Sequence, residues 1–332
     1  MKKRKLIKLL ILISIISAIL LWAYARFFYQ DIWSIGLYAG PNPFEFSSHP
    51  LVRQNPVLAA GNVTDVRANY VADPFLVHDN KTWHMFFEVF NASSDQGDIG
   101  LATSKDEVNW KYEKIVLDEP FHLSYPYIFK WNESYYMIPE SRRGAAIKLY
   151  KAEEFPEKWS FLSDMIVGDY ADPSIVFRDG KWWLFALKGQ DELTLHYAEN
   201  PTGPWIEHPK SPLIKGNAKI LRPGGRLTVF GDKIIRYAQG DDPVYGTVVR
   251  AFQIDEMTET DYRDHEITQS PILRPSGHGW NSAGMHHIDP YRIDENKWIA
   301  CVDGKRREKA FVWKAAGRRI LNRFKRLMNS LH

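Results

Sequence analysis

Cysteine is nearly absent from this chain of 332 residues, in which Cys301 is the single example. One cysteine excludes an intramolecular disulfide and any metal centre built from several thiolates. The chain also lacks the glycine-rich phosphate loop, the dinucleotide-binding fingerprint and the nucleophile elbow of serine hydrolases. No Asp-x-Asp pair occurs, which argues against a metal-dependent nucleotide-sugar transferase of the usual kind.

The small net charge hides an uneven distribution. The formal net charge is +3, yet residues 1–26 carry +6 and residues 305–332 carry +9, which leaves −12 on the residues between them. An acidic body argues against nucleic acid as a partner.

What the sequence does contain is a two-strand unit that recurs five times. Each copy combines an apolar run that begins near a proline, a short polar turn and a second aromatic run, as expected for a β-hairpin. The prolines follow one another at intervals of 52, 47, 50 and 67 residues. They are Pro74, Pro126, Pro173, Pro223 and Pro290. A β-rich period near 50 residues indicates a propeller or solenoid.

A second pair of strands follows four of these hairpins, so four blades of four strands each are predicted. The fifth hairpin lacks such a pair. The segment Ile35–Ala39 matches the outer strand Ile99–Thr103 in sequence, and we expect it to complete the fifth blade and close the ring. The predicted fold is an all-β, five-bladed β-propeller that forms one domain over residues 33–304.

Both ends of the chain carry membrane signals. Five basic residues precede an uncharged, mostly apolar run of 17 residues, Leu9–Ala25, which predicts one transmembrane or signal helix within residues 1–26. The run ends on Ala23-Tyr24-Ala25, which also fits a signal-peptidase site, so an uncleaved anchor and a cleaved signal peptide both stay open. In either case we expect export, and for the anchor a single-pass membrane protein with its propeller on the extracytoplasmic side.

Residues 305–332 form a basic tail. Apolar residues recur in it at spacings of three and four, with arginine and lysine mostly between them, which predicts an amphipathic helix. Such a helix could lie on an anionic membrane surface or pack under the propeller. Gly317 weakens it.

Polar residues are expected to gather at one mouth of the propeller, the end at which the first strand of each hairpin begins and the second strand ends. Loops and strand ends on a rigid scaffold are the usual place for binding residues. The residues that this geometry brings to the mouth are Asp73, Glu88, Tyr125, Glu140, Asp172, Arg222, Gln239, Asp289 and Asp303.

Several carboxylates around one mouth suit the cleavage of glycosidic bonds, which needs one carboxyl protonated as acid and one ionised as base or nucleophile. Crowding of like charges raises the pKa of one member and creates the proton donor. We predict Asp73 as base or nucleophile, Glu140 as acid and Asp172 as a tuning or orienting residue. Alternatively, the Asp-Pro pairs are turn formers whose carboxylates bind nearby backbone N–H groups.

The other polar residues near the mouth are predicted to bind substrate. They are Glu88, Tyr125, Arg142, Arg222, Gln239, His286, His287 and Asp289. Adjacent histidines on a strand point to opposite faces, so His286 and His287 are not expected to hold one metal ion. The prediction therefore includes no required cofactor and no metal ligands, with calcium or a water favoured over zinc in the axial channel.

Several runs of this sequence resemble one family. They include Ala72-Asp73-Pro74, Phe87-Glu88-Val89, Gly97–Ala102, His122–Pro126, Ile138–Ser141 and Gly284–Pro290. Over about residues 33–304 the chain is similar to the N-terminal domain of plant glucosamine inositolphosphorylceramide transferases and its bacterial relatives. In the plant proteins a separate glycosyltransferase domain follows, to which nothing here corresponds, so the transferase activity is not carried over with the propeller.

The wider architecture is similar to the five-bladed propellers of glycoside hydrolase family 43 and its clan. That resemblance implies a first-blade aspartate as base, a second aspartate as pKa modulator and a glutamate as acid. Asp73 matches the first role. The second-blade position is Tyr125, however, and Leu187 stands where a third-blade carboxylate would be expected, so Glu140 or Glu88 would have to supply the acid.

Together these features predict an exported, membrane-tethered propeller that hydrolyses or transfers glycosidic bonds of a glycan or glycolipid. Two other interpretations stay open, a non-catalytic glycan-binding module and a scaffold of envelope polysaccharide or glycolipid synthesis. An enzyme predicts a mouth carboxylate with a raised pKa beside an ionised one. A binding module predicts carboxylates that are hydrogen-bonded to the backbone or to each other.

Overall fold

The computed structural model describes residues 12–19 and 27–311. The chain divides into two compact units, one made of Met1–Ile32 with Arg307–His332 and the other of Trp33–Arg306. In the first unit, residues 12–19 are helical. Within the described ranges, no helix has the length and hydropathy that crossing a membrane requires. The predicted membrane helix lies partly, and the predicted tail helix from residue 312 onward wholly, outside these ranges.

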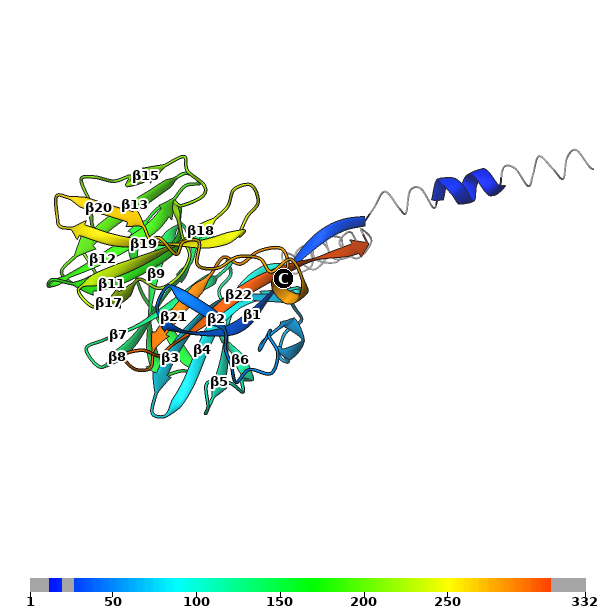
Figure 1. Cartoon of the computed structure of the whole chain (residues 1–332), viewed down its shortest axis with the longest axis horizontal. Helices are drawn as coiled ribbons and strands as arrows, with labels where there is room; N and C mark the ends of the chain where they lie inside the picture. The colour runs from blue at the N-terminus through cyan, green and yellow to red at the C-terminus, as the bar shows by residue number, and fades with distance from the viewer. Residues whose placement is uncertain (1–11, 20–26, 312–332) are drawn as a thin grey trace, which may run out of the picture. The chain divides into compact units, whose positions relative to one another are not determined.

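Five antiparallel sheets are the five blades that the repeats predict (Figure 1). The first blade comprises β3 (Ala68–Asp79), β4 (Thr82–Asn91), β5 (Gln96–Ser104) and β6 (Lys111–Leu117). The second comprises β7 (Ser124–Trp131), β8 (Ser134–Glu140), β9 (Ala146–Glu154) and β10 (Lys158–Val167). The third comprises β11 (Tyr170–Arg178), β12 (Lys181–Lys188), β13 (Glu192–Ala198), β14 (Ile206–Glu207) and β15 (Ile214–Lys215).

The fourth blade comprises β16 (Arg222–Pro223), β17 (Thr228–Phe230), β18 (Lys233–Gly240), β19 (Val248–Met257) and β20 (Tyr262–Glu266). The third and fourth blades thus contain five strands each, where four were predicted. The outer strand of the third blade is split into β14 and β15, which both pair with β13. The inner strand of the fourth blade is split into β16 and β17, which both pair with β18.

The N-terminal segment completes the fifth blade, as predicted. Its strand order is β2-β1-β22-β21. These strands are β1 (Phe27–Asn42), β2 (Glu45–Ser48), β21 (Ile288–Arg292) and β22 (Trp298–Phe311). Because β21 packs beside β3 and Ile288 bridges to Gly225 of the fourth blade, the fifth blade closes the ring. Residues 305–311 continue strand β22, although the sequence placed them in the tail.

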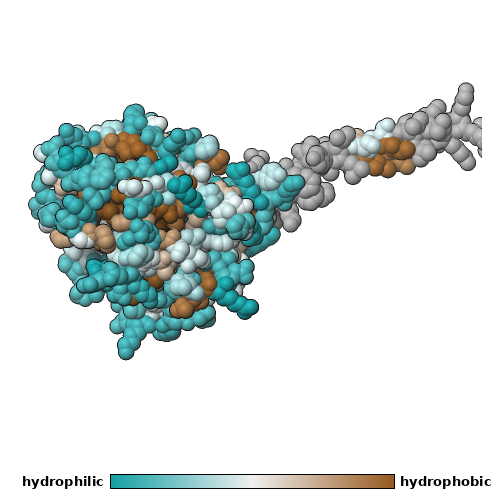
Figure 2. Space-filling view, viewed as in Figure 1, coloured by the Kyte–Doolittle hydropathy of each residue, from teal (hydrophilic) through white to brown (hydrophobic). Residues whose placement is uncertain are grey.

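Short 3₁₀ helices occupy three connections, namely η1 (Ala60–Asn62), η2 (Arg142–Gly144) and η3 (Gly279–Asn281). Aromatic and aliphatic side chains fill the space between blades. Tyr136, Trp182 and Trp183 belong to this core. Burying each such side chain stabilises the fold by about 1.5–3 kcal/mol. In the view of Figure 2, hydrophilic residues cover most of the propeller unit and the hydrophobic ones form separate small areas.

The inner strands of the first three blades share one irregularity at the mouth. Their pairing slips around the proline, between Ala72 and Phe75 in the first blade and at the matching places in the other two. The residue before each proline takes a left-handed conformation, with φ of 51° at Asp73, 46° at Tyr125 and 50° at Asp172. Such bulges re-aim a side chain, and left-handed non-glycine residues are uncommon. By contrast, Asp289 pairs in regular register with Cys301.

Candidate functional site

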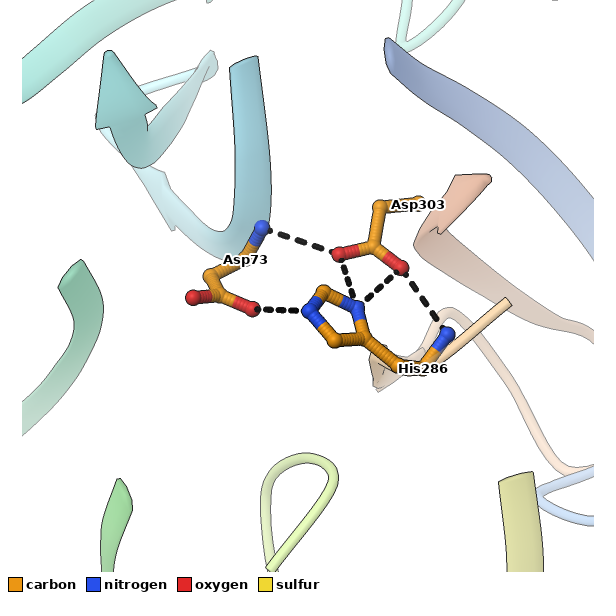
Figure 3. A group of neighbouring side chains, drawn as sticks. All are labelled: Asp73, His286 and Asp303. Carbon is orange, nitrogen blue, oxygen red and sulfur yellow. Dashed lines mark hydrogen bonds and ion pairs between the residues drawn. The ribbon is translucent and has the colours of Figure 1, made fainter. Parts of the chain in front are cut away.

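Asp303, on β22, is the anchor of the mouth. It is fully buried and accepts hydrogen bonds from the backbone N–H groups of Asp73, His286 and His287, each at 3.1 Å. The Nδ1 atom of His286 lies 2.7 Å from both of its carboxylate oxygens (Figure 3). Burial alone would raise the pKa of Asp303, but the charge of His286 and these hydrogen bonds outweigh burial and lower it. Asp303 is therefore a fixed anion that orients His286.

Asp73, at the bulge of β3, faces two imidazole rings. Its Oδ1 atom lies 3.7 Å from Nε2 of His286 and 3.9 Å from Nδ1 of His287. The residue is 8% exposed, and burial raises the pKa of its carboxyl to about 7, with His286 opposing the rise and Asp303 adding to it. A carboxyl with such a pKa can hold or release a proton near neutral pH.

The adjacent histidines precede strand β21, and both rings face Oδ1 of Asp73 although the strand pattern predicted opposite faces; they differ in packing and in the direction of their pKa shifts. His286 stacks on Trp33 with ring centroids 3.9 Å apart, whereas the His287 ring lies edge-on to Phe75 and Tyr125. Burial works against a charge on His286, but Asp303 and Asp73 outweigh burial and raise its pKa. Burial lowers the pKa of His287 to about 4, so that ring is neutral. The two rings therefore face the same carboxyl of Asp73, but the pKa of one is raised and that of the other is lowered.

Glu88 ends β4 beside this group. The hydroxyl of Tyr70 donates to its Oε1 atom at 3.3 Å, and Nε2 of His122 lies 3.7 Å from the same oxygen. Burial, followed by the charge of Asp73, raises the pKa of Glu88 well above its ordinary value. Gly97 permits this approach, because a Cβ there would stand 2.8 Å from the Glu88 oxygen and 2.2 Å from a backbone carbonyl.

Asp172, at the bulge of β11, is paired with a cation. Its Oδ2 atom accepts a hydrogen bond from Nε of Arg222 at 2.5 Å and from the amide of Gln239 at 3.0 Å. The guanidinium of Arg222 also lies over the ring of Tyr245, 5.2 Å from its centroid, and 3.9 Å from Asp241. The sequence-predicted residues Asp172, Arg222 and Gln239 therefore form one network between the third and fourth blades.

Glu140 ends β8 next to this network. Its Oε1 atom accepts the backbone N–H of Arg142 at 3.2 Å, and the side chain is buried. Burial raises the pKa of Glu140 to about 7, the charge of Asp172 adds to the rise and Arg222 opposes it. The guanidinium of Arg142 is itself engaged with Asp169 at 2.5 Å, so its predicted substrate contact would compete with that ion pair.

Tyr125 was expected to face substrate at the mouth, but its hydroxyl is used inside the protein. It donates to the carbonyl of Gly225 at 3.0 Å, accepts the N–H of the same residue at 2.7 Å and lies 2.8 Å from Oγ of Ser174. The left-handed bulge and the size of the ring carry the hydroxyl to the third and fourth blades. Tyr125 therefore joins three blades.

Asp289 was also predicted to bind substrate, and it too is used inside the protein. It is fully buried, accepts the N–H of Leu76 at 2.5 Å and forms an ion pair with Arg226 at 2.5 Å. Arg226 also donates to the carbonyl of Ile128 at 2.7 Å, so this pair joins four blades. Since a guanidinium already lies among these oxygens, the donor set does not fit the calcium ion considered for the axial channel.

A metal ion is a second chemistry to test at the mouth. Asp73, His286 and Asp303 offer ligand atoms that lie within 4.8 Å of one another. The oxygens of Asp303 already accept four N–H groups, however, one of which is Nδ1 of His286. Asp73 and Nε2 of His286 are left as donors, and two donors are too few for zinc or calcium. The group is better suited to proton transfer.

Sequence reasoning missed several partners of these residues. It placed Asp303 at the mouth without a role, although its position at the end of a second strand matches that of Glu88. Trp33, Tyr70, His122 and Tyr245 were given no role at the site. They come from the N-terminal strand, the start of β3 and two connections, where the repeat carries no signal for them.

Comparisons with known proteins agree on one family. The family model of the N-terminal region of glucosamine inositolphosphorylceramide transferase 1 matches residues 29–305. Curated proteins with the name glucosamine inositolphosphorylceramide transferase 1 from Oryza sativa subsp. indica and Arabidopsis thaliana are 34% and 32% identical to this chain over 302 residues. The matches cover 83% of this chain but 40% and 39% of those proteins, so the chain spans about 40% of their length.

Solved structures resemble the fold at low sequence identity. A β-1,2-mannobiose phosphorylase from Listeria innocua has a TM-score of 0.58 and 13% identity, covering 81% of this chain and 96% of its own. An α-L-arabinofuranosidase from Podospora anserina has a TM-score of 0.53 and 12% identity, covering 71% and 90%. An α-L-arabinanase from Cellvibrio cellulosa has a TM-score of 0.51 and 15% identity, covering 71% and 91%. At such identities the likeness concerns the fold.

Proposed function

This chain belongs to the family of the N-terminal domain of glucosamine inositolphosphorylceramide transferase 1, and on that premise we propose that it is a glycan-active propeller that hydrolyses or transfers glycosidic bonds. One observation carries the proposal. Asp73 and Glu140 are both buried at the mouth, and burial raises the pKa of each carboxyl to about 7. Carboxyl groups tuned in this way are what glycosidic chemistry uses.

In this proposal the two carboxyls have different roles because their neighbours differ. Asp73 faces an imidazole nitrogen of His286 that can take up its proton, so Asp73 serves as base or nucleophile. Glu140 stands near the charge of Asp172, which raises its pKa and favours the protonated form, so Glu140 serves as acid. Asp172, held by Arg222, orients and tunes the site.

The substrate class is proposed as a glycan or glycolipid. The relatives are named for a transferase of glucosamine and inositolphosphorylceramide, and the structural neighbours are named for enzymes of mannobiose and arabinose-containing glycans. Because the chain spans about 40% of the relatives, their transferase activity is not assigned to it. The family and the carboxylates of the mouth support a carbohydrate ligand.

We also propose that the chain is exported and tethered to a membrane, with the propeller on the extracytoplasmic side and the basic tail touching anionic lipid. The basic start of the chain and the apolar run Leu9–Ala25 support this topology. Protease should digest the propeller when it is added to cells whose outer envelope has been opened but whose cytoplasmic membrane is still closed. Digestion confined to inverted vesicles would contradict the proposed topology.

A non-catalytic glycan-binding module is the second candidate, and a specific observation favours it. Asp303 and Asp289 are hydrogen-bonded to backbone N–H groups, and Asp172 is paired with Arg222. Asp303 and Asp289 therefore match the pattern expected of a binding module, whereas Asp172 is bound by side chains. Glu140 matches it as well, because its Oε1 atom accepts the backbone N–H of Arg142, whereas Asp73 and Glu88, whose pKa values are raised by burial, do not match it.

The deciding experiment compares Glu140→Gln with Glu133→Gln in the full chain, purified in detergent and offered a panel of oligosaccharides and glycolipids. Glu133 lies in the turn at the other end of the same hairpin and its side chain is 92% exposed, so it is the matched control. We expect Glu140→Gln to lose turnover by roughly 100-fold or more while keeping glycan binding, and Glu133→Gln to match the unaltered chain. Glycan binding without turnover in all three proteins would contradict the hydrolase or transferase and support the binding module.

A further inference from the structure

The ring of His286 lies between two carboxylates, and hydrogen bonding settles which of its nitrogens carries a proton (Figure 3). Asp303 accepts three backbone N–H groups, which favour its ionised form, and a carboxylate can only accept. Nδ1 of His286, 2.7 Å from it, therefore carries a hydrogen. Nε2 is then the ring nitrogen whose protonation can change, and it faces Oδ1 of Asp73 at 3.7 Å.

Packing keeps the ring in this position. Trp33 lies almost parallel to it, with an interplanar angle of 21°, and Tyr245 meets it edge-on at 5.3 Å. The charged and titratable groups that face the ring come from several elements. They are Asp303 on β22, Asp73 on β3, Arg222 on β16, and Asp241 and Tyr245 in the connection after β18.

His287 turns a hydrogen-bond acceptor, rather than a donor, toward Oδ1 of Asp73. Its Nε2 atom is 2.9 Å from the carbonyl of Pro74, and a carbonyl only accepts, so Nε2 carries the hydrogen of this neutral ring. Nδ1 is then a bare acceptor 3.9 Å from Oδ1 of Asp73, and it finds no hydrogen-bond partner in the part of the chain that the structure describes. One imidazole therefore favours a proton on Asp73, while the other can remove it.

We propose that one proton is shared between Oδ1 of Asp73 and Nε2 of His286, which makes His286 a positioning residue for the proposed chemistry. Because 3.7 Å exceeds a direct hydrogen bond, the transfer runs through one bridging water. The O–H bond of Asp73 breaks and its electron pair stays on the carboxylate, the water accepts that proton and releases another, and an N–H bond forms on Nε2. Asp303 takes up no proton and balances the imidazolium. The role in catalysis rests on the proposed function, but the shared proton can be measured without any substrate.

The test is a pH titration of the histidine rings by ¹⁵N nuclear magnetic resonance on the full chain, beside Asp73→Asn and Asp303→Asn. In the unaltered chain we expect Nδ1 of His286 to stay protonated and Nε2 to titrate in two coupled steps. Asp73→Asn should leave a single step at lower pH. Asp303→Asn should weaken proton binding by roughly tenfold or more, which is one pKa unit. A His286 titration that is unchanged in Asp73→Asn, or an unprotonated Nδ1, would overturn the proposal.

Asp73→Asn keeps the test decisive if Asp303→Asn fails to fold. Among residues 27–311, the side chain of Asp73 accepts no backbone N–H group, so its replacement by asparagine removes the charge without leaving a backbone donor unpaired. The two proposals also fail separately. Coupled titration without turnover of any glycan would support the shared proton and contradict the proposed function. Turnover of a glycan with uncoupled titration would support the proposed function and contradict the shared proton.

Discussion

Asp73 and Asp172 occupy the same tripeptide, Ala-Asp-Pro, on the inner strands of the first and third blades. Both sit at a bulge, with φ of 51° and 50°, and both are buried. Asp172 meets Arg222 of the fourth blade at 2.5 Å, whereas Asp73 meets the imidazoles of the fifth blade at 3.7 and 3.9 Å. The bulge at the tripeptide orients each carboxyl in the same way. The residues of the neighbouring blade then determine whether its partner is a permanent cation or a proton acceptor.

The largest expected effect comes from removing the cation on the Asp172 side. Arg222→Met leaves Asp172 buried without its charged partner, and we expect unfolding free energy to fall by about 3–4 kcal/mol. Urea unfolding measures the loss. Lys233→Met is the matched control, because its ion pair with Asp232 is exposed and should be worth about 0.5 kcal/mol. A loss below about 1 kcal/mol for Arg222→Met would remove the contrast between the two aspartates.

Replacing Asp73 is expected to raise the free energy of unfolding rather than lower it, by an amount that depends on pH. Burial raises the pKa of Asp73 to about 7, so ionisation is unfavourable in the folded chain. The penalty is absent below the unfolded pKa of about 3.9, grows as pH rises and is complete above pH 7. Asp73→Asn removes this penalty. The difference in unfolding free energy between the variant and the unaltered chain should therefore shift in favour of the variant by roughly 1–3 kcal/mol as the pH rises from 5 to 8. Parallel urea unfolding at the two pH values, with Asp172→Asn beside it as a variant that should lose stability at pH 8, checks this.

The smallest effect concerns the second blade, where Tyr125 stands at the position of these aspartates. Tyr125→Phe deletes a buried hydroxyl and leaves the N–H of Gly225 without its acceptor, which should cost about 1–2 kcal/mol. Tyr29→Phe is the control, since Tyr29 is 65% exposed and should change the unfolding free energy by less than about 0.5 kcal/mol. Equal stability of the two variants would mean that this hydroxyl does not join the blades.

The architecture could be read from the sequence because its signals are local. The proline spacing, the hairpin turns and the match between Ile35–Ala39 and Ile99–Thr103 predicted five blades and a ring closed by the N-terminal segment. The split strands of the third and fourth blades were not predictable. The repeat has no feature that marks where a strand is interrupted.

The mouth could be predicted as a group of residues but not as a set of partners. Strand ends brought Asp73, Glu140 and Asp172 to one end of the propeller. Which partner each carboxyl meets depends on contacts between residues far apart in the chain, namely Asp172 with Arg222, 50 positions away, and Asp73 with His286 and His287 of the fifth blade. Asp289 shows the same limit, because its regular register and its pair with Arg226 are properties of the assembled ring.

The measurement that tests the account most directly is a pH titration of the Asp73 carboxyl by ¹³C nuclear magnetic resonance, with Asp73→Asn to assign its signal. The account predicts that this carboxyl changes protonation near pH 7, since burial raises its pKa to about 7. A single transition at the ordinary aspartate value, about 4, would contradict the account. In that case Asp73 and Asp172 would both be simple carboxylates, and the mouth would have no base poised for neutral pH.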